Sequence, residues 1–226
     1  MIKTSFDFNE GEVLLINKPY EWTSFDVVKK LKYALKIQKI GHAGTLDPLA
    51  TGLLILCTGK LTKKIDSYQQ QEKEYEGILV LGKTTPSIDL ETSFNSETDI
   101  SHITSQEVVD TAEKFKGSIS QIPPQYSAVK VAGERVYKKA RKGIQVPIKP
   151  RDVFIKAFVI TKIELPEVHF KIVCSKGTYI RSLVRDFGAT LKTGAYLKAL
   201  TRTRIGDFSL NQAFQLTDLI GRLKHK

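Results

Sequence analysis

The sequence predicts an α+β fold, in which a mixed, largely antiparallel sheet is flanked by helices. Segments with strand character and segments with helical periodicity are interleaved along the 226 residues, without the regular βαβ rhythm that would indicate a parallel sheet. Residues 167–174 alternate apolar and polar side chains, which is typical of a half-buried strand, and residues 153–163 are its expected partner. No internal repeat is visible.

Further strands are expected in residues 12–17, 75–81 and 196–208. The apolar residues 52–57 form either a strand or another short buried segment, because periodicity does not separate the two. Residues 87–101 are rich in turn formers and acids, so we expect a surface loop there.

Two helices are expected to begin with a capping box, in which a hydroxyl residue is followed three positions later by an acid. Thr23 with Asp26 begins the first, and Thr104 with Glu107 begins the second. Thr178 is expected to cap a third helix. Further helices are expected in residues 61–68, 134–142 and 216–223. The helix in residues 134–142 would present two faces, a basic one with Arg135, Lys138 and Lys142 and an apolar one with Val136, Ala140 and Ile144.

The composition is that of a globular protein that can bury a core, with 41% hydrophobic and 26% charged residues. The longest clean apolar run, residues 53–57, is far too short to cross a membrane, and we see no signal peptide. Cys57 and Cys174 are expected to be buried free thiols, and no metal-ligand spacing is present. These features predict a cytoplasmic protein.

Positive charge is concentrated in one part of the chain. The net charge is +11, and residues 130–162 carry ten Lys or Arg against two Asp or Glu, whereas residues 84–113 carry seven acids and no Lys or Arg. A basic block of this kind indicates a polyanion as partner. A solvated, lysine-rich surface is the alternative.

Residues 41–52, Gly-His-Ala-Gly-Thr-Leu-Asp-Pro-Leu-Ala-Thr-Gly, form the most informative segment. Three glycines indicate positive φ or close backbone approach, and the proline restricts the exit direction. We expect a loop that holds Asp47 in one place at the mouth of a strand. The alternative is that Asp47 only caps its own turn.

Arg181 is the second candidate for chemistry. With Thr178 as cap, it would lie in the first turn of its helix, where the helix dipole disfavours a cation. The expected compensation is an anion, either a carboxylate or a phosphate, and Lys176 with the free N–H groups of the helix start would add to an anion site. A plain surface arginine is the alternative.

Several enzyme classes lack their motifs in this chain. The Walker loop, the dinucleotide fingerprint, HExxH and paired cysteines are absent, and the histidines are scattered. The remaining inventory is one Asp, one Arg and a Tyr, without cofactor or metal. A lone carboxylate can attack an anomeric carbon, whereas a glycosidase needs a second carboxylate, which residues 41–52 do not supply.

Five segments in order resemble the motifs of the TruB family of tRNA pseudouridine synthases, and residues 41–52 resemble its catalytic motif almost letter for letter. The others are Leu-Leu-Ile-Asn-Lys-Pro at 14–19 with Trp-Thr-Ser at 22–24, Lys-Glu-Tyr at 73–75 with Leu-Gly at 81–82, Cys-Ser-Lys-Gly-Thr-Tyr-Ile-Arg at 174–181, and Gly-Ala-Tyr-Leu at 194–197 with Leu-Thr-Arg-Thr at 200–203. Residues 123–143 also resemble the family's RNA-gripping insertion, which we place at about 121–152.

The resemblance implies a role for each matching residue. Asp47 would be the nucleophile, Arg181 would pair with it, and Tyr75 would stack on the target uracil close to the C5 proton. The same argument implies that His42 helps to hold the T loop with its uridine flipped out, and that Lys18 supports the active-site loop or contacts RNA.

Further residues would contact the substrate. Tyr179 and Leu200 would line the base pocket, with Lys176 nearby on the anion site. The RNA backbone would meet the basic insertion through Lys130, Arg135, Lys138 and Lys142. Residue type alone also allows plainer interpretations, in which Tyr75, Tyr179 and Leu200 are core residues and His42 is a turn residue.

The implied function is isomerisation of uridine 55 in the T loop of tRNA, by one catalytic domain spanning residues 1–226, with the fold of that family. The reaction needs no cofactor, and the implied partner is the T arm of tRNA, with no obligate protein partner and no membrane. The chain resembles a short form without the family's further C-terminal RNA-binding domain.

Two further departures from the family pattern and three rival functions remain. Glu21 stands where the family has Gly, and it would strain the loop if that position needs positive φ. Pro86 and Ser87 replace Asp-Thr, although Asp89 is retained. The rivals are a non-catalytic RNA-folding protein on the same scaffold, a pseudouridine synthase for another RNA, and a nucleosidase or glycosidase that uses Asp47.

Overall fold

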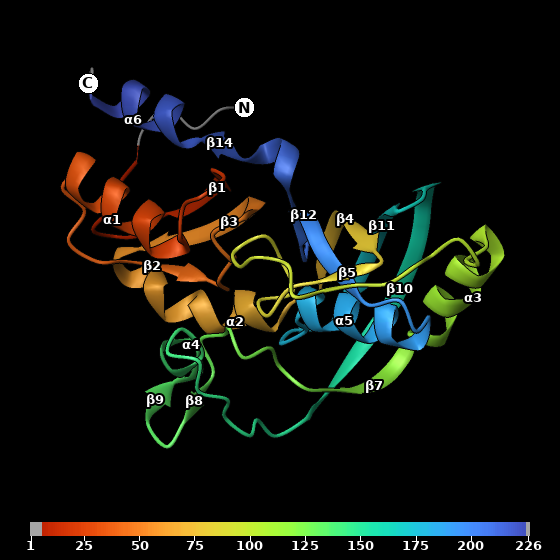
Figure 1. Ribbon diagram of the computed structural model, residues 1–226. Helices are drawn as coiled ribbons and strands as arrows, with labels where there is room; N and C mark the ends of the chain where they lie inside the picture. Colours follow the sequence, from red (N-terminus) through yellow and green to blue (C-terminus); the bar gives the residue numbers. More distant parts are fainter. Residues whose placement is uncertain (1–5, 225–226) are drawn as a thin grey trace. The chain divides into compact units, whose positions relative to one another are not determined.

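The computed structural model describes residues 6–224 (Figure 1). The chain forms two compact units: the terminal unit, Met1–Tyr75 with Leu200–Lys226, and the central unit, Glu76–Ala199. Two strands, β4 (Lys73–Leu81) and β12 (Ala195–Ile205), begin in one unit and end in the other. The chain therefore passes between the units within strands and not through linkers.

The strands of the terminal unit lie in the order β14, β1, β3, β12. Strand β3 (Ala50–Thr58) is central: it pairs antiparallel with β1 (Val13–Lys18) and with β2 (Ile40–Ala43), and parallel with β12. Two short strands complete this part, β13 (Phe208–Ser209) on β12 and β14 (Phe214–Gln215) on β1. The sheet is mixed and largely antiparallel, as the sequence predicts.

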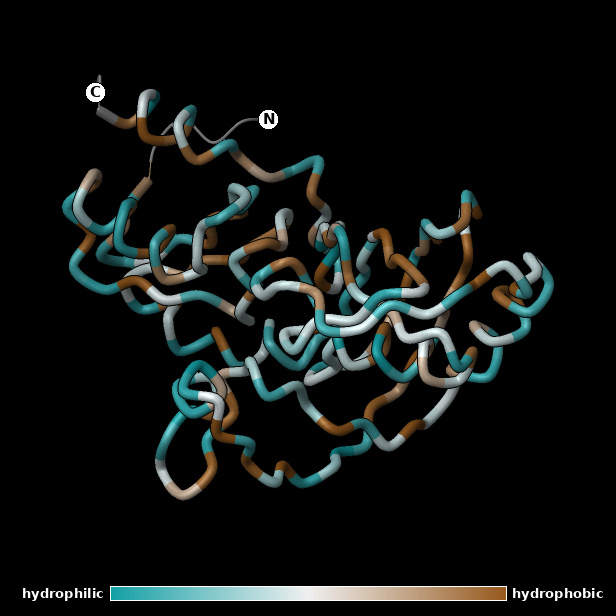
Figure 2. The backbone as a smooth tube through the Cα atoms, viewed as in Figure 1, coloured by the Kyte–Doolittle hydropathy of each residue, from teal (hydrophilic) through white to brown (hydrophobic). Residues whose placement is uncertain are grey.

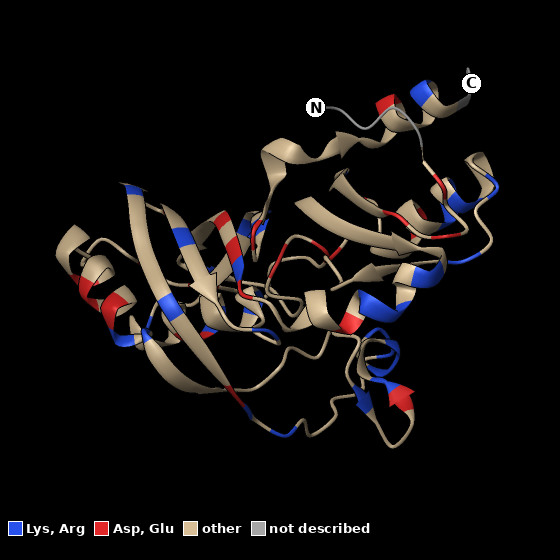
Figure 3. Ribbon diagram, turned by 180° about the vertical axis from the view of Figure 1, so that it is seen from behind, with Lys and Arg blue, Asp and Glu red and all other residues tan. Residues whose placement is uncertain are grey.

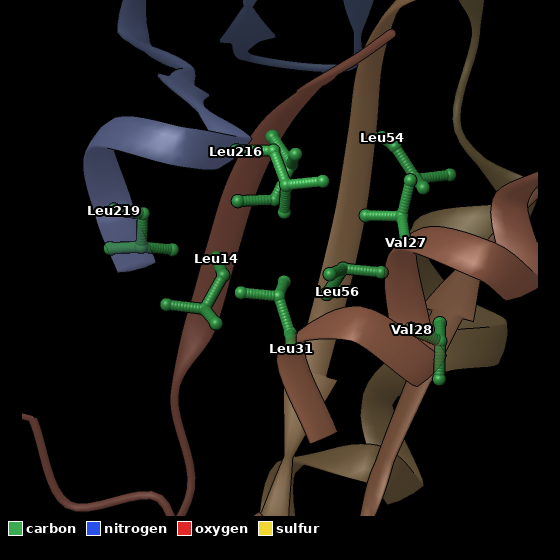
Figure 4. Close-up of a cluster of buried hydrophobic side chains, with 9 residues drawn as sticks. Leu14, Val27, Val28, Leu31, Leu54, Leu56, Leu216 and Leu219 are labelled. Carbon is green, nitrogen blue, oxygen red and sulfur yellow. The ribbon is translucent and has the colours of Figure 1, made fainter. Parts of the chain in front are cut away.

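The apolar run 53–57 is a strand buried on both faces. On one face Leu54 and Leu56 pack with β1, with helix α1 (Ser24–Ala34) and with helix α6 (Leu216–Lys224), as Figure 4 shows. On the other face Leu53, Ile55 and Cys57 pack with Ala43 and Ile205. Burial on both faces explains why this strand has a continuous apolar sequence and no alternation.

Short helices follow β3 in the terminal unit. A 3₁₀ turn, η1 (Gly59–Lys64), leads into α2 (Ile65–Gln70), and a second one, η2 (Leu210–Gln212), precedes β14. Hydropathy alternates along the helices (Figure 2). In residues 6–224 no helix is long and apolar enough to cross a membrane.

The central unit has the strand order β4, β11, β10, β7, where β7 is Gly117–Gln121, β10 is Arg151–Glu164 and β11 is Glu167–Cys174. Strand β10 pairs antiparallel with both β11 and β7. Helices α3 (Ser105–Lys114) and α5 (Ile180–Thr190) belong to this unit, whose core includes the ring contacts of Phe158 with Phe115, Phe170 and Phe187. Two small hairpins, β5 (Lys83–Thr84) with β6 (Ser96–Glu97) and β8 (Lys130–Val131) with β9 (Glu134–Arg135), precede helix α4 (Val136–Ala140).

Both capping boxes are confirmed, since Thr23 and Thr104 each exchange hydrogen bonds with the acid three residues later. The alternation in residues 167–174, the closing helix and the two buried free cysteines are also confirmed. Residues 52–57, for which periodicity left two interpretations open, are part of a strand.

Three local predictions are wrong. The N-cap of α5 is Tyr179 and not Thr178, whose hydroxyl donates to the carbonyl of Ser175 instead. The helix expected in residues 134–142 is only Val136–Ala140, because the preceding residues pair in the β8–β9 hairpin, and Ile144 is exposed. The segment 87–101 is not all surface, since residues 87–89 are buried.

Candidate active site

Asp47 lies in the loop between β2 and β3, residues 44–49, as the glycine-rich segment predicts. The Asp47 carbonyl accepts a hydrogen bond from the Ala50 N–H, which closes a tight turn into β3. On the other side, the Ser24 hydroxyl accepts from the Leu46 N–H at 2.9 Å, and Ser24 is buried at the start of α1. The loop is therefore tied to the first helix immediately before Asp47.

Lys18 anchors the loop immediately after Asp47. It ends β1 and its side chain is fully buried. Its ammonium group donates to the carbonyl of Pro48 at 3.1 Å and to the carbonyls of Pro19 and Trp22. Burial lowers the pKa of Lys18 to about 8, and the negative charge of Asp47 opposes this shift. Lys18 thus places a positive charge next to the Asp47 loop, and the negative charge of Asp47 offsets part of the cost of burying it.

Arg202 holds the start of the same loop, a role that the sequence reasoning did not assign. The side chain is 1% exposed. Its guanidinium donates to the carbonyl of Leu53 at 2.8 Å, to that of Gly44 at 3.1 Å and, at the limit of 3.5 Å, to that of Thr45. The signal in the sequence was an arginine in the middle of a strand-like motif. If such a residue is buried, it needs hydrogen-bond acceptors or an opposite charge as partners.

Close approach of β12 to β3 makes the Arg202 contacts possible. Gly52 has φ +102°, and a Cβ there would lie 2.4 Å from the carbonyl oxygen of Arg202. Only glycine therefore lets the two backbones meet at this register, where Arg202 is paired with Gly52. The hydroxyls of Thr51 and Thr201 are hydrogen-bonded at 2.9 Å one position earlier.

His42 lies on β2, just before the loop. Burial, followed by the charge of Arg202, lowers the pKa of its imidazole. The ring is therefore neutral at neutral pH, which suits hydrogen bonding to a neutral base or a hydroxyl better than pairing with phosphate.

Tyr75 and Leu200 are both buried, each 8% exposed, on β4 and β12 of the terminal unit. The neighbouring Glu74 accepts a hydrogen bond from the Thr203 hydroxyl at 2.9 Å. Their burial fits either a place beneath a bound base or an ordinary core position, so their substrate roles stay predictions.

The loop residue Glu21 has φ +64°, the left-handed conformation in which glycine is favoured. The strain expected from this departure is therefore present. Lys18 compensates for it locally, because its ammonium bonds the carbonyls of Pro19 and Trp22 on both sides of Glu21.

Arg181, in the central unit, is also buried, with 3% exposed. It lies in the first turn of α5 and donates to the carbonyls of Ser87 at 3.0 Å and Tyr126 at 2.8 Å. The Asp89 carboxylate is 3.6 Å away. The expected anion is thus present as a carboxylate, on the retained Asp89. Pairing of Arg181 with Asp47 stays a prediction.

Tyr179 is held at the N-terminus of α5. Its N–H and carbonyl form a pair of hydrogen bonds with the Gln121 side chain at 2.8 and 3.1 Å. The Arg151 guanidinium lies 5.0 Å from the centre of its ring, within range of a cation–π interaction. Lys176, three residues earlier, is exposed.

The basic insertion is built from the β8–β9 hairpin and α4. The predicted RNA-backbone residues are all exposed on it: Lys130, Arg135, Lys138 and Lys142. Val136 and Ala140 are buried and anchor the insertion, and Gln125 bonds the backbone of Val146 through both its amide atoms. Figure 3 shows blue segments gathered on this part of the central unit. Within residues 6–224 no group of three or more His, Cys, Asp or Glu could hold a metal ion.

Residues 32–180 match the sequence profile of the TruB family pseudouridylate synthases, N-terminal domain. The chain belongs to the TruB family. The tRNA pseudouridine synthase B of Flavobacterium johnsoniae is 50% identical over 221 residues, which are 95% of this chain and 96% of that protein. That of Clostridium tetani is 47% identical over 207 residues, covering 92% of this chain and 72% of the relative.

A solved structure, the crystal structure of a Cbf5-Nop10-Gar1 complex, contains a chain of similar fold. It is 29% identical, with a TM-score of 0.75 over 95% of this chain. The present chain spans only 54% of that chain. The likeness confirms the predicted α+β class.

Lys18 gives a pH-dependent prediction. Its pKa falls on folding from 10.5 to about 8, so in this range the unfolded chain holds a proton that the folded chain has released. The contribution of Lys18 to the free energy of unfolding therefore rises with pH across this window. We expect wild type to gain up to roughly 3 kcal/mol relative to Lys18→Met from about pH 8 to about pH 10. Urea unfolding at the two pH values measures it.

The exposed Lys63→Met serves as the control for this measurement and should show no such change. A constant stability difference between wild type and Lys18→Met at both pH values would contradict the prediction.

Replacing Arg202 with Met leaves the carbonyls of Gly44, Thr45 and Leu53 without their donor. We expect a loss of about 2–5 kcal/mol in the free energy of unfolding. Arg204, on the same strand, pairs with Glu72 and is 30% exposed, so Arg204→Met should cost about 1 kcal/mol or less. Denaturation curves of both variants measure this. Equal losses of unfolding free energy in the two variants would contradict the prediction that burial makes Arg202 the more important residue.

Proposed function

We propose that this chain is a tRNA pseudouridine synthase that isomerises uridine 55 in the T loop. The support is its membership of the TruB family and identity of about half over nearly the full length of relatives named tRNA pseudouridine synthase B. The single observation that carries the chemistry is the Asp47 loop, held on both sides of Asp47 by buried Ser24 and Lys18.

The reaction breaks the N1–C1′ glycosidic bond of uridine, turns the uracil and joins C5 to C1′. A proton leaves C5 and N1 gains one, so the product is an isomer of the substrate and nothing is oxidised or reduced. In our proposal the Asp47 carboxylate is the nucleophile. Arg181 pairs with this carboxylate, and Tyr75 stacks on the uracil near the C5 proton.

The target uridine has to leave its stack before an enzyme can reach it. An aromatic platform such as Tyr75 returns roughly 1–3 kcal/mol of lost stacking per base. We propose that the neutral His42 helps to hold the opened T loop, that Tyr179 and Leu200 line the base pocket, and that the exposed Lys176 contacts a phosphate. Lys18 is proposed to support the loop, since it is fully buried.

The T arm is proposed to bind the basic insertion through its four exposed cations, Lys130, Arg135, Lys138 and Lys142. We further propose that residues 1–226 act as one catalytic domain in the cytoplasm, without a cofactor or an obligate protein partner. Two strands shared by both units support treating them as one domain.

Asp47→Asn tests the chemistry directly. The amide keeps the shape of the side chain but removes its nucleophilic charge, so we expect pseudouridine formation on an unmodified tRNA transcript to be abolished. tRNA binding should stay within about three-fold, a change worth well under 1 kcal/mol.

Asp66→Asn, an exposed carboxylate on α2, is the matched control and should retain full activity. Product formed by Asp47→Asn would remove Asp47 as the nucleophile. Tight binding without product from wild type would favour the RNA-folding rival, and product elsewhere than the T loop would favour another RNA substrate.

Charge reversal at Arg135, Lys138 and Lys142 tests the insertion. Each phosphate contact contributes about 0.7–0.9 to the slope of log affinity against log salt, so the triple variant should raise KM and flatten the salt dependence by about two. The same reversal at Lys114, Lys192 and Arg222, which are exposed elsewhere, controls for net charge. An unchanged salt slope in steady-state assays would mean that the insertion does not touch phosphates.

A further inference from the structure

Helix α1 exposes two aromatic side chains that its own unit leaves uncovered. Tyr33 is 73% exposed and Phe25 is 67% exposed, the two highest values among the exposed large hydrophobic residues of the described chain. Nothing in the proposed chemistry uses them. Exposing two large aromatic rings to water is unfavourable, so their presence on one helix needs an explanation.

The two rings share one face of α1 with two lysines. Relative to Phe25, Lys29, Lys32 and Tyr33 are four, seven and eight positions on, which places all four within a sector of about 100°. Val27, Val28 and Leu31 occupy the opposite face and pack into the terminal-unit core (Figure 4). The outer face is therefore a stripe in which two lysines lie between two aromatic residues.

Positive charge continues past the helix. Residues 29–39 contain five lysines and no acid, and within the described part of the chain none of them is within ion-pair distance of an Asp or Glu. The nearby acid Asp26 is occupied by the capping box with Thr23, whose hydrogen bonds lower the pKa of that carboxyl. Figure 3 shows the blue segments along α1.

The chemistry of this face fits RNA better than other occupants. Lysine is depleted at the centres of protein interfaces. A helix that lies on a membrane needs its apolar side free, whereas the apolar side of α1 is buried in the core. Aromatic rings among cations are what single-stranded nucleic acid binds, since bases stack on the rings and phosphates meet the charges.

We propose that the outer face of α1, formed by Phe25, Lys29, Lys32 and Tyr33, is a second RNA-binding surface for the tRNA substrate. Lys29 and Lys32 contact phosphates, and Phe25 and Tyr33 stack on an unpaired base. This inference rests on the proposed function, and it adds a surface in the terminal unit to the basic insertion of the central unit.

The test is equilibrium binding of unmodified tRNA at several salt concentrations, with turnover measured separately. Lys29→Gln with Lys32→Gln should weaken binding about five- to twenty-fold at low salt and lower the salt slope by about one and a half. Phe25→Ala with Tyr33→Ala should weaken binding about three- to ten-fold with the slope unchanged, because stacking releases no counterions. In both variants kcat at saturating tRNA should stay at the wild-type value while KM rises.

Lys114→Gln with Lys192→Gln is the matched control, with the same change in net charge at exposed lysines of the central unit. Lys29→Arg with Lys32→Arg should restore both affinity and slope. Affinities and slopes of the α1 variants equal to the control would overturn the proposal and leave this face to a protein partner. A wild type that binds tRNA but forms no pseudouridine would overturn the proposed function and leave this binding test intact.

Discussion

The Asp47 loop depends on two buried cations that satisfy its backbone. The carbonyl groups of this loop lie next to a strand end, and a carbonyl that is shielded from water destabilises the fold if it is left without a donor. Arg202 donates to carbonyls before Asp47, and Lys18 donates to the carbonyl directly after it. The negative charge of Asp47 also interacts with the ammonium group of Lys18, so one of the groups that hold the loop in shape lies within electrostatic range of the carboxylate.

The rest of the terminal unit places these two cations. Lys18 ends β1 and Arg202 lies on β12, and both strands pair with β3, which begins directly after the loop. Burial of β3 on both faces keeps that strand in one register. Gly52 permits the close approach of β12, and without it the guanidinium would be moved away from the loop carbonyls. The hydrophobic packing of β3 thus determines where the charged groups of Lys18 and Arg202 lie, next to the Asp47 loop.

Arg181 in the central unit is also a buried cation whose charge is balanced by oxygen atoms. Its partners are one carboxylate and two backbone carbonyls, whereas Lys18 and Arg202 bond backbone carbonyls. Its charge is buried against Asp89 and two backbone oxygens, which is the condition under which a buried cation persists. Asp89 and Ser87 lie in a segment that reads as surface loop from its composition. The contact with Arg181 uses the Ser87 carbonyl, which any residue at that position would supply.

The sequence by itself determined the α+β class, both capping boxes, the strand alternation and the candidate residues Asp47 and Arg181, because these depend on local periodicity, local hydrogen bonds and contiguous motifs. It did not reveal Arg202 as a loop anchor, the Asp89 partner of Arg181, or the true cap of α5 at Tyr179. Those were decided by the tertiary structure, since each depends on residues more than fifty positions apart that only the folded chain brings within hydrogen-bond reach. The exposure of Phe25 and Tyr33 on α1 was likewise decided by the tertiary structure, because it depends on which face of the helix packs against the core.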